Sequence, residues 1–468
     1  MMKMSYYQKM LTTSDIVATP FYLIFFILAA FFIRSLIMDA DNPIRKYFIP
    51  GLMAKLLGAI MVGVVYFFYY NGGDTTQYYN NAIVFYNAFS DSPYYFYKLL
   101  MSVPDYDDPA IMTYKYWMYF HRDPSGYFLS KFAGVLTLPS FNIYTPTAMW
   151  LAFVSYSGVW GLYVTLCKIY PEMYKKFAFA VLFVPSVFFW GSGILKDTVT
   201  FSCVGWMTYS TYNLFFARRK LILNGFILLL STYVCLRLKA YIVFSMLPAL
   251  IFWVFLHYRT KLNSKFLRGA MGPVAILAGA AFGFLIIRQL GSQYKNYSLE
   301  GAVKTAETFQ QFHGFLAEHE QASGYDLGAT DGSYTSILLK LPVAANVTLF
   351  RPYLWEVRNP VMLLSALEST IMMLFAIRIF WKTGIRHTFR SLAKNPTAFF
   401  CIFFSIFFAF CVGFSAYNFG ALVRYKIPCI PFFISGLLIL NMQTQVDTAQ
   451  RKKKENAAKP QRFAFDTA

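Results

Sequence analysis

Charged residues are scarce in this chain of 468 residues, where they make up 14% against about 25% in soluble domains. Apolar residues reach 57% and aromatic residues 20%. A soluble protein could not hide that much apolar surface and still cover itself with polar groups. The composition therefore excludes a soluble enzyme, a secreted disulfide scaffold and a disordered chain, and it predicts lipid as the main solvent.

Several catalytic and metal-binding motifs are also missing. The six cysteines lie in or at the edge of apolar runs and form no CxxC pair, which argues against a disulfide framework or a zinc site. The five histidines show no metal-ligand spacing, and no GxSxG, Walker or HExxH motif occurs.

Long apolar runs predict the fold class. A membrane span needs about 20 mostly apolar residues, because its backbone polar groups must be satisfied within the segment. We expect an all-α, polytopic transmembrane helix bundle with about 11 spans. The candidate spans are roughly 17–38, 50–70, 145–167, 177–192, 198–217, 221–236, 240–257, 269–287, 361–381, 396–417 and 427–442.

Lys and Arg predict the orientation of this bundle. With the N-terminus outside and the C-terminus in the cytoplasm, the inner segments hold 22 of the 42 basic residues and six of the 22 acidic residues. The net charge of +20 then forms a collar facing anionic lipid, and nucleic-acid binding is not needed to explain it. Residues 1–442 form the membrane domain, and the basic tail 443–468 is predicted to be disordered.

Two long loops fall on the outer side, roughly 71–144 and 288–360, whereas the inner loops are short. Their aromatic, half-apolar stretches are typical of helices that lie in the membrane interface. Only the outer face therefore has enough material for an active site.

Asp74 is the sharpest candidate for chemistry. It follows the second predicted span directly, in the segment NGGDTTQYYNNA at 71–82. A carboxylate at the lipid–water boundary could serve as a general base, or it could simply cap the next helix. The run Asp105, Asp107 and Asp108 could bind a divalent ion or form a solvated turn.

Cations at the outer ends of spans are the second signal. Lys196 and Asp197 begin one span as either a self-neutralising pair or an anion site. Further basic residues could anchor the spans by snorkelling or hold a phosphate with forked donors. The candidate substrate-binding residues are Lys196, Asp197, Arg237, Lys239, Arg351, Arg358 and Arg424.

Two ionisable residues, Glu368 and Arg378, lie within one predicted span. Such residues suggest a transport or proton pathway, although Ser365 and Ser369 could satisfy Glu368 structurally. His121 is the only histidine near the Asp74 segment.

The segment GDxxxYY at 73–79 and the late Arg424-Tyr-x-x-Pro-x-x-Pro431 entry resemble two related groups. One is the GT-C glycosyltransferases, which use polyprenyl-phosphate sugars, and the other is the O-antigen-type polymerases and ligases. The resemblance implies a catalytic role for Asp74 and phosphate contacts from Lys196, Arg237, Arg351 or Arg424. The chain departs from the GT-C pattern by an extra span before Asp74 and by the lack of a clear second acidic motif.

We therefore expect a hexosyltransferase-like enzyme of the bacterial inner membrane that takes a polyprenyl-linked sugar donor and a glycan or lipid acceptor at the outer face. The sequence leaves the cofactor unknown and does not require a divalent metal. A polymerase or ligase, a transporter or flippase using Glu368 and Arg378, and a non-catalytic assembly subunit remain alternatives.

Overall fold

The computed structural model describes residues 11–104, 108–260, 324–328, 336 and 339–458. These ranges are helical, and the only β pairing among them is an isolated bridge between Gly324 and Asn418. The all-α prediction is therefore confirmed for the described residues. The expected span 269–287 and most of the expected outer loop 288–360 lie outside them.

The helices follow the chain in a simple order. The first half holds α1 (Thr13–Ile37), η1 (Arg45–Tyr47), α2 (Phe48–Val64), η2 (Val65–Tyr69), α3 (Asp74–Asp91), α4 (Pro93–Met101), α5 (Met112–Tyr116), α6 (Pro124–Thr137), α7 (Tyr144–Ile169), η3 (Pro171–Met173), α8 (Tyr174–Leu182), α9 (Pro185–Trp190), α10 (Lys196–Thr211) and η4 (Tyr212–Phe216). The second half holds α11 (Leu221–Thr260), α15 (Leu341–Phe350), η6 (Leu354–Glu356), α16 (Pro360–Thr383), α17 (Ile385–Lys394), α18 (Pro396–Ala416), α19 (Phe419–Tyr425) and α20 (Ile430–Ala458).

Six of the described helices are long and apolar enough to cross a membrane, or seven if the bent pair α19 and α20 forms one span. The expected number of about eleven is not reached by this criterion. The expected span 177–192 is divided between α8 and α9, and α10 is only 16 residues long. The expected spans 221–236 and 240–257 fall within the single element α11.

The chain reverses direction within α11. Asn224, near its start, is hydrogen-bonded to Asn213, whereas Tyr258, near its end, donates to the Phe215 carbonyl, and both partners lie in η4. A straight helix would hold residues 224 and 258 about 50 Å apart. The break falls at Lys239, the one residue in α11 with non-helical backbone angles.

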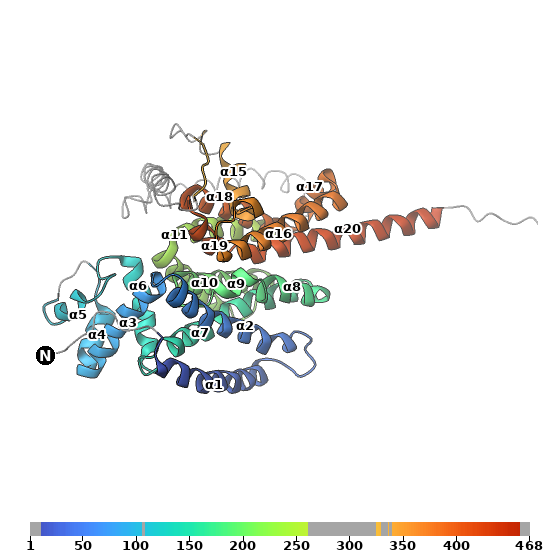
Figure 1. Cartoon of the computed structure of the whole chain (residues 1–468). Coiled ribbons are helices and arrows are strands. Elements are labelled where there is room, and N and C mark those ends of the chain that lie inside the picture. Colours follow the sequence, from blue (N-terminus) through green and yellow to red (C-terminus); the bar gives the residue numbers. More distant parts are fainter. Residues whose placement is uncertain (1–10, 105–107, 261–323, 329–335, 337–338, 459–468) are drawn as a thin grey trace, which may run out of the picture.

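The bundle has two chemically different ends (Figure 1). Helices α3–α6 gather at one end, here called the loop end, together with the start of α10 and the reversal in α11. The other end is here called the basic end. There Tyr47 packs on Tyr174, and Tyr170 is hydrogen-bonded to Asn395. The basic end includes residues 38–47, 170–176, 217–220 and 382–395, which are four of the segments that lie on the inner side in the predicted orientation.

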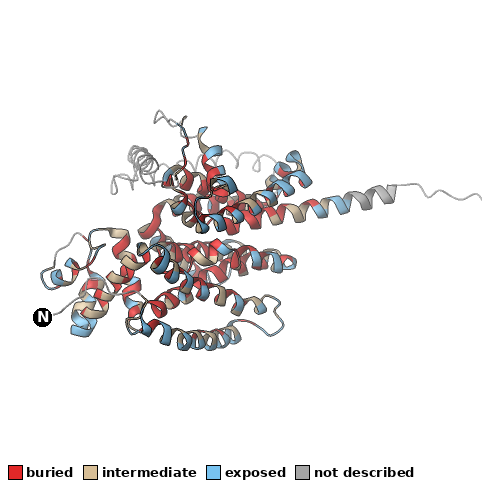
Figure 2. Cartoon of the chain, in the orientation of Figure 1, coloured by how far each residue is buried: buried red, intermediate tan, exposed pale blue. Residues whose placement is uncertain are grey.

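Buried residues lie on the faces between the helices, and exposed residues lie on the outside (Figure 2). Many of the exposed residues are large and apolar. On α1 and α11, large apolar residues such as Phe21 and Ile222 stand exposed. An apolar surface of this extent on several long helices needs a lipid environment. The predicted bilayer partner and multi-pass membrane character therefore agree with the structure.

Small residues let two central helices approach closely. Gly158 on α7 and Gly205 on α10 face each other, and a Cβ on either one would strike backbone atoms of the opposite helix. Close backbone contact of this kind is a main source of helix association in lipid, where there is no hydrophobic driving force between helices.

The tail differs from the composition-based expectation. α20 continues as a helix to Ala458, although residues from 443 onward were predicted to be disordered. Residues 459–468 lie outside the described part of the chain.

Candidate functional site

A sharp turn after α2 places Asp74 at the loop end. α2 continues into one turn of π-helix, η2, and then Asn71, Gly72 and Gly73 adopt positive φ angles of 53°, 127° and 131°. Glycine adopts such angles without steric cost. A Cβ on Gly73 would lie 2.9 Å from the Tyr66 ring, so no larger residue fits there without displacing that ring. Asp74 then begins α3, where the helix dipole favours a negative charge.

Arg424 is the direct partner of Asp74. Its Nη1 lies 2.6 Å from the Asp74 carboxylate and also donates to the Tyr66 hydroxyl at 3.1 Å. The short helix α19 positions Arg424, and Asn418 caps the start of that helix by accepting from the backbone N–H groups of Gly420 and Ala421. The two partners are 350 residues apart in the sequence, so packing alone joins them.

A second carboxylate extends this pair into a network of four charges. Asp197, at the start of α10, is 2% exposed, and its Oδ2 lies 3.3 Å from Arg424 Nε. Its other oxygen lies 2.5 Å from Lys239 Nζ, at the reversal of α11. Lys239 also lies over the Tyr425 ring, 3.9 Å from the centroid. The charges of Asp74, Arg424, Asp197 and Lys239 alternate and balance, which makes their burial tolerable.

A pocket opens beside this network. Its volume is about 430 Å³, within the range of roughly 300–1,000 Å³ that is typical of small-molecule sites. Asp74 and Arg424 form its charged wall. Its other lining residues are aromatic or small, with one amide: Tyr66, Tyr70, Trp190, Gly72, Gly73, Asn418, Gly420 and Ala421.

Lys196 points away from Asp197 and toward the first loop. Its Nζ lies 2.6 Å from the Ser125 hydroxyl and 3.3 Å from the Asp123 carboxylate at the start of α6. Burial acts to raise the pKa of Asp123, but the Lys196 charge and the Ser125 hydrogen bonds outweigh it and hold the pKa below its ordinary value. Lys196 and Asp197 are therefore not the self-neutralising pair that their adjacency suggests.

Tyr78 lies between these two groups of charges. It is 4% exposed, and burial is the main reason that its phenol pKa is raised. The charges of Asp74, Arg424, Asp123 and Asp197 all act on the same phenol. The Lys196 ammonium lies 5.7 Å from the Tyr78 ring centroid. Both groups of charges therefore belong to one polar region at the loop end.

The other predicted cations contact different partners. Arg351 is hydrogen-bonded to Glu356 at 3.0 Å through Nε and packs over Phe419. Arg237 lies over the Phe128 ring, 5.7 Å from its centroid, and Arg358 is exposed just before α16. None of these three lines the pocket beside Asp74. Of the arginines that we expected to meet there, Arg424 alone does.

Glu368 has a structural partner that the sequence did not indicate. It accepts hydrogen bonds from the Ser186 backbone N–H at 2.8 Å and from the Ser186 hydroxyl at 2.5 Å. It therefore satisfies donors at the start of α9, whereas the structural alternative in the sequence analysis was that Ser365 and Ser369 satisfy it. Ser369 instead accepts from Lys426 Nζ at 2.8 Å.

The remaining candidates in the first loop are held locally. His121 Nδ1 contacts the Met118 carbonyl at 2.7 Å, and Asp108 pairs with Lys98 at 2.8 Å. Asp105 and Asp107 lie outside the described residues. Within the described ranges, no three His, Cys, Asp or Glu side chains gather in a way that could hold a metal ion.

Sequence reasoning missed the aromatic part of the pocket. Tyr66 and Trp190 line it, and their rings meet edge to face at 6.3 Å. In a chain with 35 Tyr and 51 Phe, nothing in the sequence marks these rings as different from packing residues.

Comparison with protein-family models, with curated proteins and with solved structures gave no match.

Proposed function

We propose that this chain is an integral membrane glycosyltransferase that takes a polyprenyl-phosphate-linked sugar or oligosaccharide at the outer face of the bacterial inner membrane. The observation that carries the proposal is the pocket of about 430 Å³ whose charged wall is the Asp74–Arg424 pair. It combines a carboxylate, a guanidinium group and aromatic rings, which suit a hydroxyl, a phosphate and a sugar face respectively.

The charge distribution supports an outward-facing pocket. The basic end holds the cations Arg45, Lys46, Lys175 and Lys176. Asp74, which lines the pocket, begins α3 at the opposite, loop end. Cytoplasmic loops are the ones enriched in Lys and Arg. The loop end, where α3–α6 supply the material for substrate contacts, then faces away from the cytoplasm.

The proposed reaction uses the pair as follows. The donor phosphate takes over part of the Arg424 hydrogen bonding, which frees the Asp74 carboxylate to accept the proton of an acceptor hydroxyl. The acceptor oxygen forms a bond to the anomeric carbon as the bond between that carbon and the phosphate oxygen breaks. The electron pair stays on the departing phosphate, where Arg424 stabilises the added charge. Asp197 and Lys239 position Arg424 and do not touch the substrate.

The test is a transfer assay in proteoliposomes, with synthetic polyprenyl-monophosphate and polyprenyl-pyrophosphate sugars as donors and a mixture of glycan and lipid acceptors. Release of the polyprenyl phosphate is measured for wild type, Asp74→Asn and the control Asp91→Asn. Asp91 ends the same helix α3, is exposed, and accepts a hydrogen bond only from Tyr114 among the described residues.

We expect wild type and Asp91→Asn to turn over donor and Asp74→Asn to lose about 100-fold or more, the scale of general-base catalysis. Preference for the pyrophosphate donor would assign the chain to the polymerase and ligase class. Equal turnover by wild type and Asp74→Asn would remove Asp74 from the mechanism. Movement of intact donor across the membrane without bond cleavage would replace the transferase by a flippase.

A further inference from the structure

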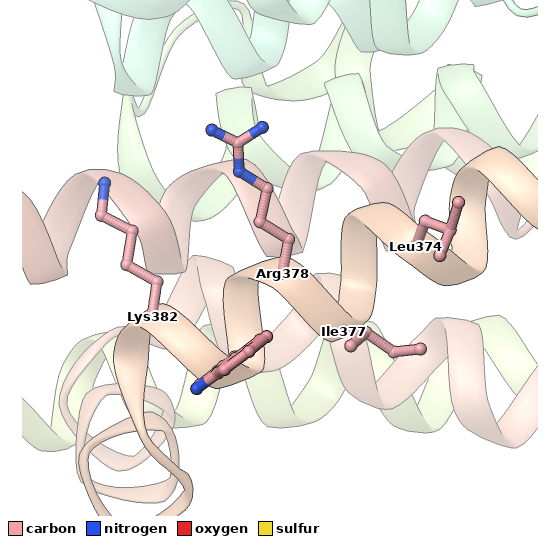
Figure 3. Close-up of a pocket in the computed structure, with 5 residues that line it drawn as sticks. Leu374, Ile377, Arg378 and Lys382 are labelled. Carbon is pink, nitrogen blue, oxygen red and sulfur yellow. The ribbon is translucent and has the colours of Figure 1, made fainter.

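A second pocket lies at the basic end, on the side of α16 that faces away from the bundle. Its volume is about 560 Å³, and the described residues that line it are Leu374, Ile377, Arg378, Trp381 and Lys382. Figure 3 shows Arg378 and Lys382 projecting in the same direction from the helix, one turn apart. It lies at the opposite end of the bundle from the Asp74 pocket, so it is independent of the proposed transferase site.

This side of α16 faces the surroundings of the protein. Ile377 is 51% exposed and Trp381 is 85% exposed, and Arg378 is exposed between them. Arg378 lies five residues before the end of α16, about 7.5 Å along the helix axis. A guanidinium group at that depth on an apolar, outward face is costly unless it reaches a charged partner at the membrane surface.

The protein does not supply that partner within the described residues. In those ranges, neither Arg378 nor Lys382 has a hydrogen bond or an ion pair. Two adjacent cations without a carboxylate between them attract an anion.

The cationic surface continues past the end of α16. Basic residues follow one another at four-residue intervals as Arg378, Lys382, Arg386 and Arg390. A neighbouring pocket of about 380 Å³ shares Lys382 and adds Arg386, Arg390 and Thr444. Among the described residues of this pocket the one carboxylate is Asp447, which lies 3.5 Å from His387.

The helix α17 places this surface at headgroup level. Its apolar residues Ile385 and Phe389 are 72% and 69% exposed and lie one turn apart on one side of the helix. Arg386 and Arg390 lie one turn apart on the neighbouring side. A short amphipathic helix with one basic and one apolar face lies in the membrane interface. The pocket beside Arg378 therefore opens where lipid phosphates are found.

We infer that this surface is a binding site for one phospholipid with an anionic headgroup. The phosphate lies between Arg378 and Lys382, an acyl chain runs along Leu374 and Ile377, and the headgroup extends toward Arg386. The phosphate supplies the counter-charge that Arg378 lacks, and the basic residues beyond it select an anionic headgroup over a zwitterionic one.

Native mass spectrometry of the full chain tests this site, with phosphatidylglycerol and phosphatidylcholine of identical acyl chains titrated onto delipidated protein. The variant is Arg378→Gln with Lys382→Gln. The matched control is Lys175→Gln with Lys176→Gln, which removes two exposed charges from the same end of the bundle. Two lost charges should weaken phosphatidylglycerol binding about 30-fold. They should also narrow the preference of the protein for phosphatidylglycerol over phosphatidylcholine, while the control pair stays near wild type.

Three results would overturn the inference. They are equal affinity of wild type for the two lipids, an equal loss in the control pair, and displacement of phosphatidylglycerol by millimolar inorganic phosphate, which would indicate a site for a free anion. The single change Lys382→Gln alters one exposed side chain. The affinity of this variant for phosphatidylglycerol is a second measurement, which does not depend on whether the double variant folds. The single change should weaken phosphatidylglycerol binding about fivefold, and an unchanged affinity would also count against the site.

Discussion

Asp197 should matter more for stability than Asp74, although both pair with Arg424. Asp197 is 2% exposed and forms ion pairs with Lys239 and Arg424. The Asp74 side chain is 41% exposed, and within the described residues its one ion pair is with Arg424. Asp197→Asn leaves two buried cations to share the single carboxylate of Asp74. Breaking a buried pair by removing one partner costs about 3–5 kcal/mol, whereas a half-exposed pair is worth about 0–1 kcal/mol.

The measurement is unfolding of purified wild type, Asp197→Asn and Asp74→Asn in the same lipid nanodiscs, followed by loss of the folded population on heating. Asp197→Asn should be the least stable by several kcal/mol, and Asp74→Asn should stay within about 1 kcal/mol of wild type. The double change Asp197→Asn with Lys239→Met removes one buried cation together with the carboxylate. It should recover part of the lost stability, because the remaining pair of Asp74 and Arg424 is neutral.

Two outcomes would refute this reasoning. If Asp74→Asn and Asp197→Asn lose the same stability, then burial does not decide what each carboxylate contributes. If the double variant is less stable than Asp197→Asn alone, then Lys239 stabilises the loop end through its contact with the Tyr425 ring rather than through its charge.

Three further predictions follow from other parts of the structure. Gly158→Ala should strongly destabilise the fold, because the added Cβ would strike the Ser202 backbone. The control is Gly161→Ala, one turn along α7, whose Cβ meets the Tyr209 side chain at an ordinary 3.4 Å. Equal thermal stability of the two variants would show that close α7–α10 packing does not stabilise the fold. A membrane-impermeant maleimide added to whole cells should label Ser90→Cys at the loop end but not Lys176→Cys at the basic end. The background from the native cysteines should be low, because five of them are buried. The opposite labelling pattern would reverse the proposed orientation. Burial lowers the pKa of Lys131 from 10.5 to about 8, and the charges of Arg237 and Lys115 act in the same direction. The unfolded chain therefore binds this proton more tightly than the folded chain does. As a result, the stability of the folded protein rises with pH between about 8 and 10.5. Lys131→Met should therefore lose stability relative to wild type across that window, and a difference that does not change between pH 7 and pH 10 would contradict the shift.

The sequence alone determined the properties that depend on local composition. Apolar runs require lipid and helices, because the backbone of a span must satisfy its own polar groups. The charge pattern gave a predicted orientation of the bundle. The positive φ angles of Gly72 and Gly73 after the second helix also have a local origin, because glycine adopts them without steric cost.

Only the tertiary structure decided which charges meet. Adjacency in the sequence suggested that Asp197 pairs with Lys196, yet successive residues of a helix point in different directions. Asp197 reaches Lys239 and Arg424, and Lys196 reaches Asp123 and Ser125. Glu368 likewise bonds to Ser186, 182 residues away, and not to the serines of its own helix. Such partners are chosen by how whole helices pack, and a single sequence carries no local signal for that choice.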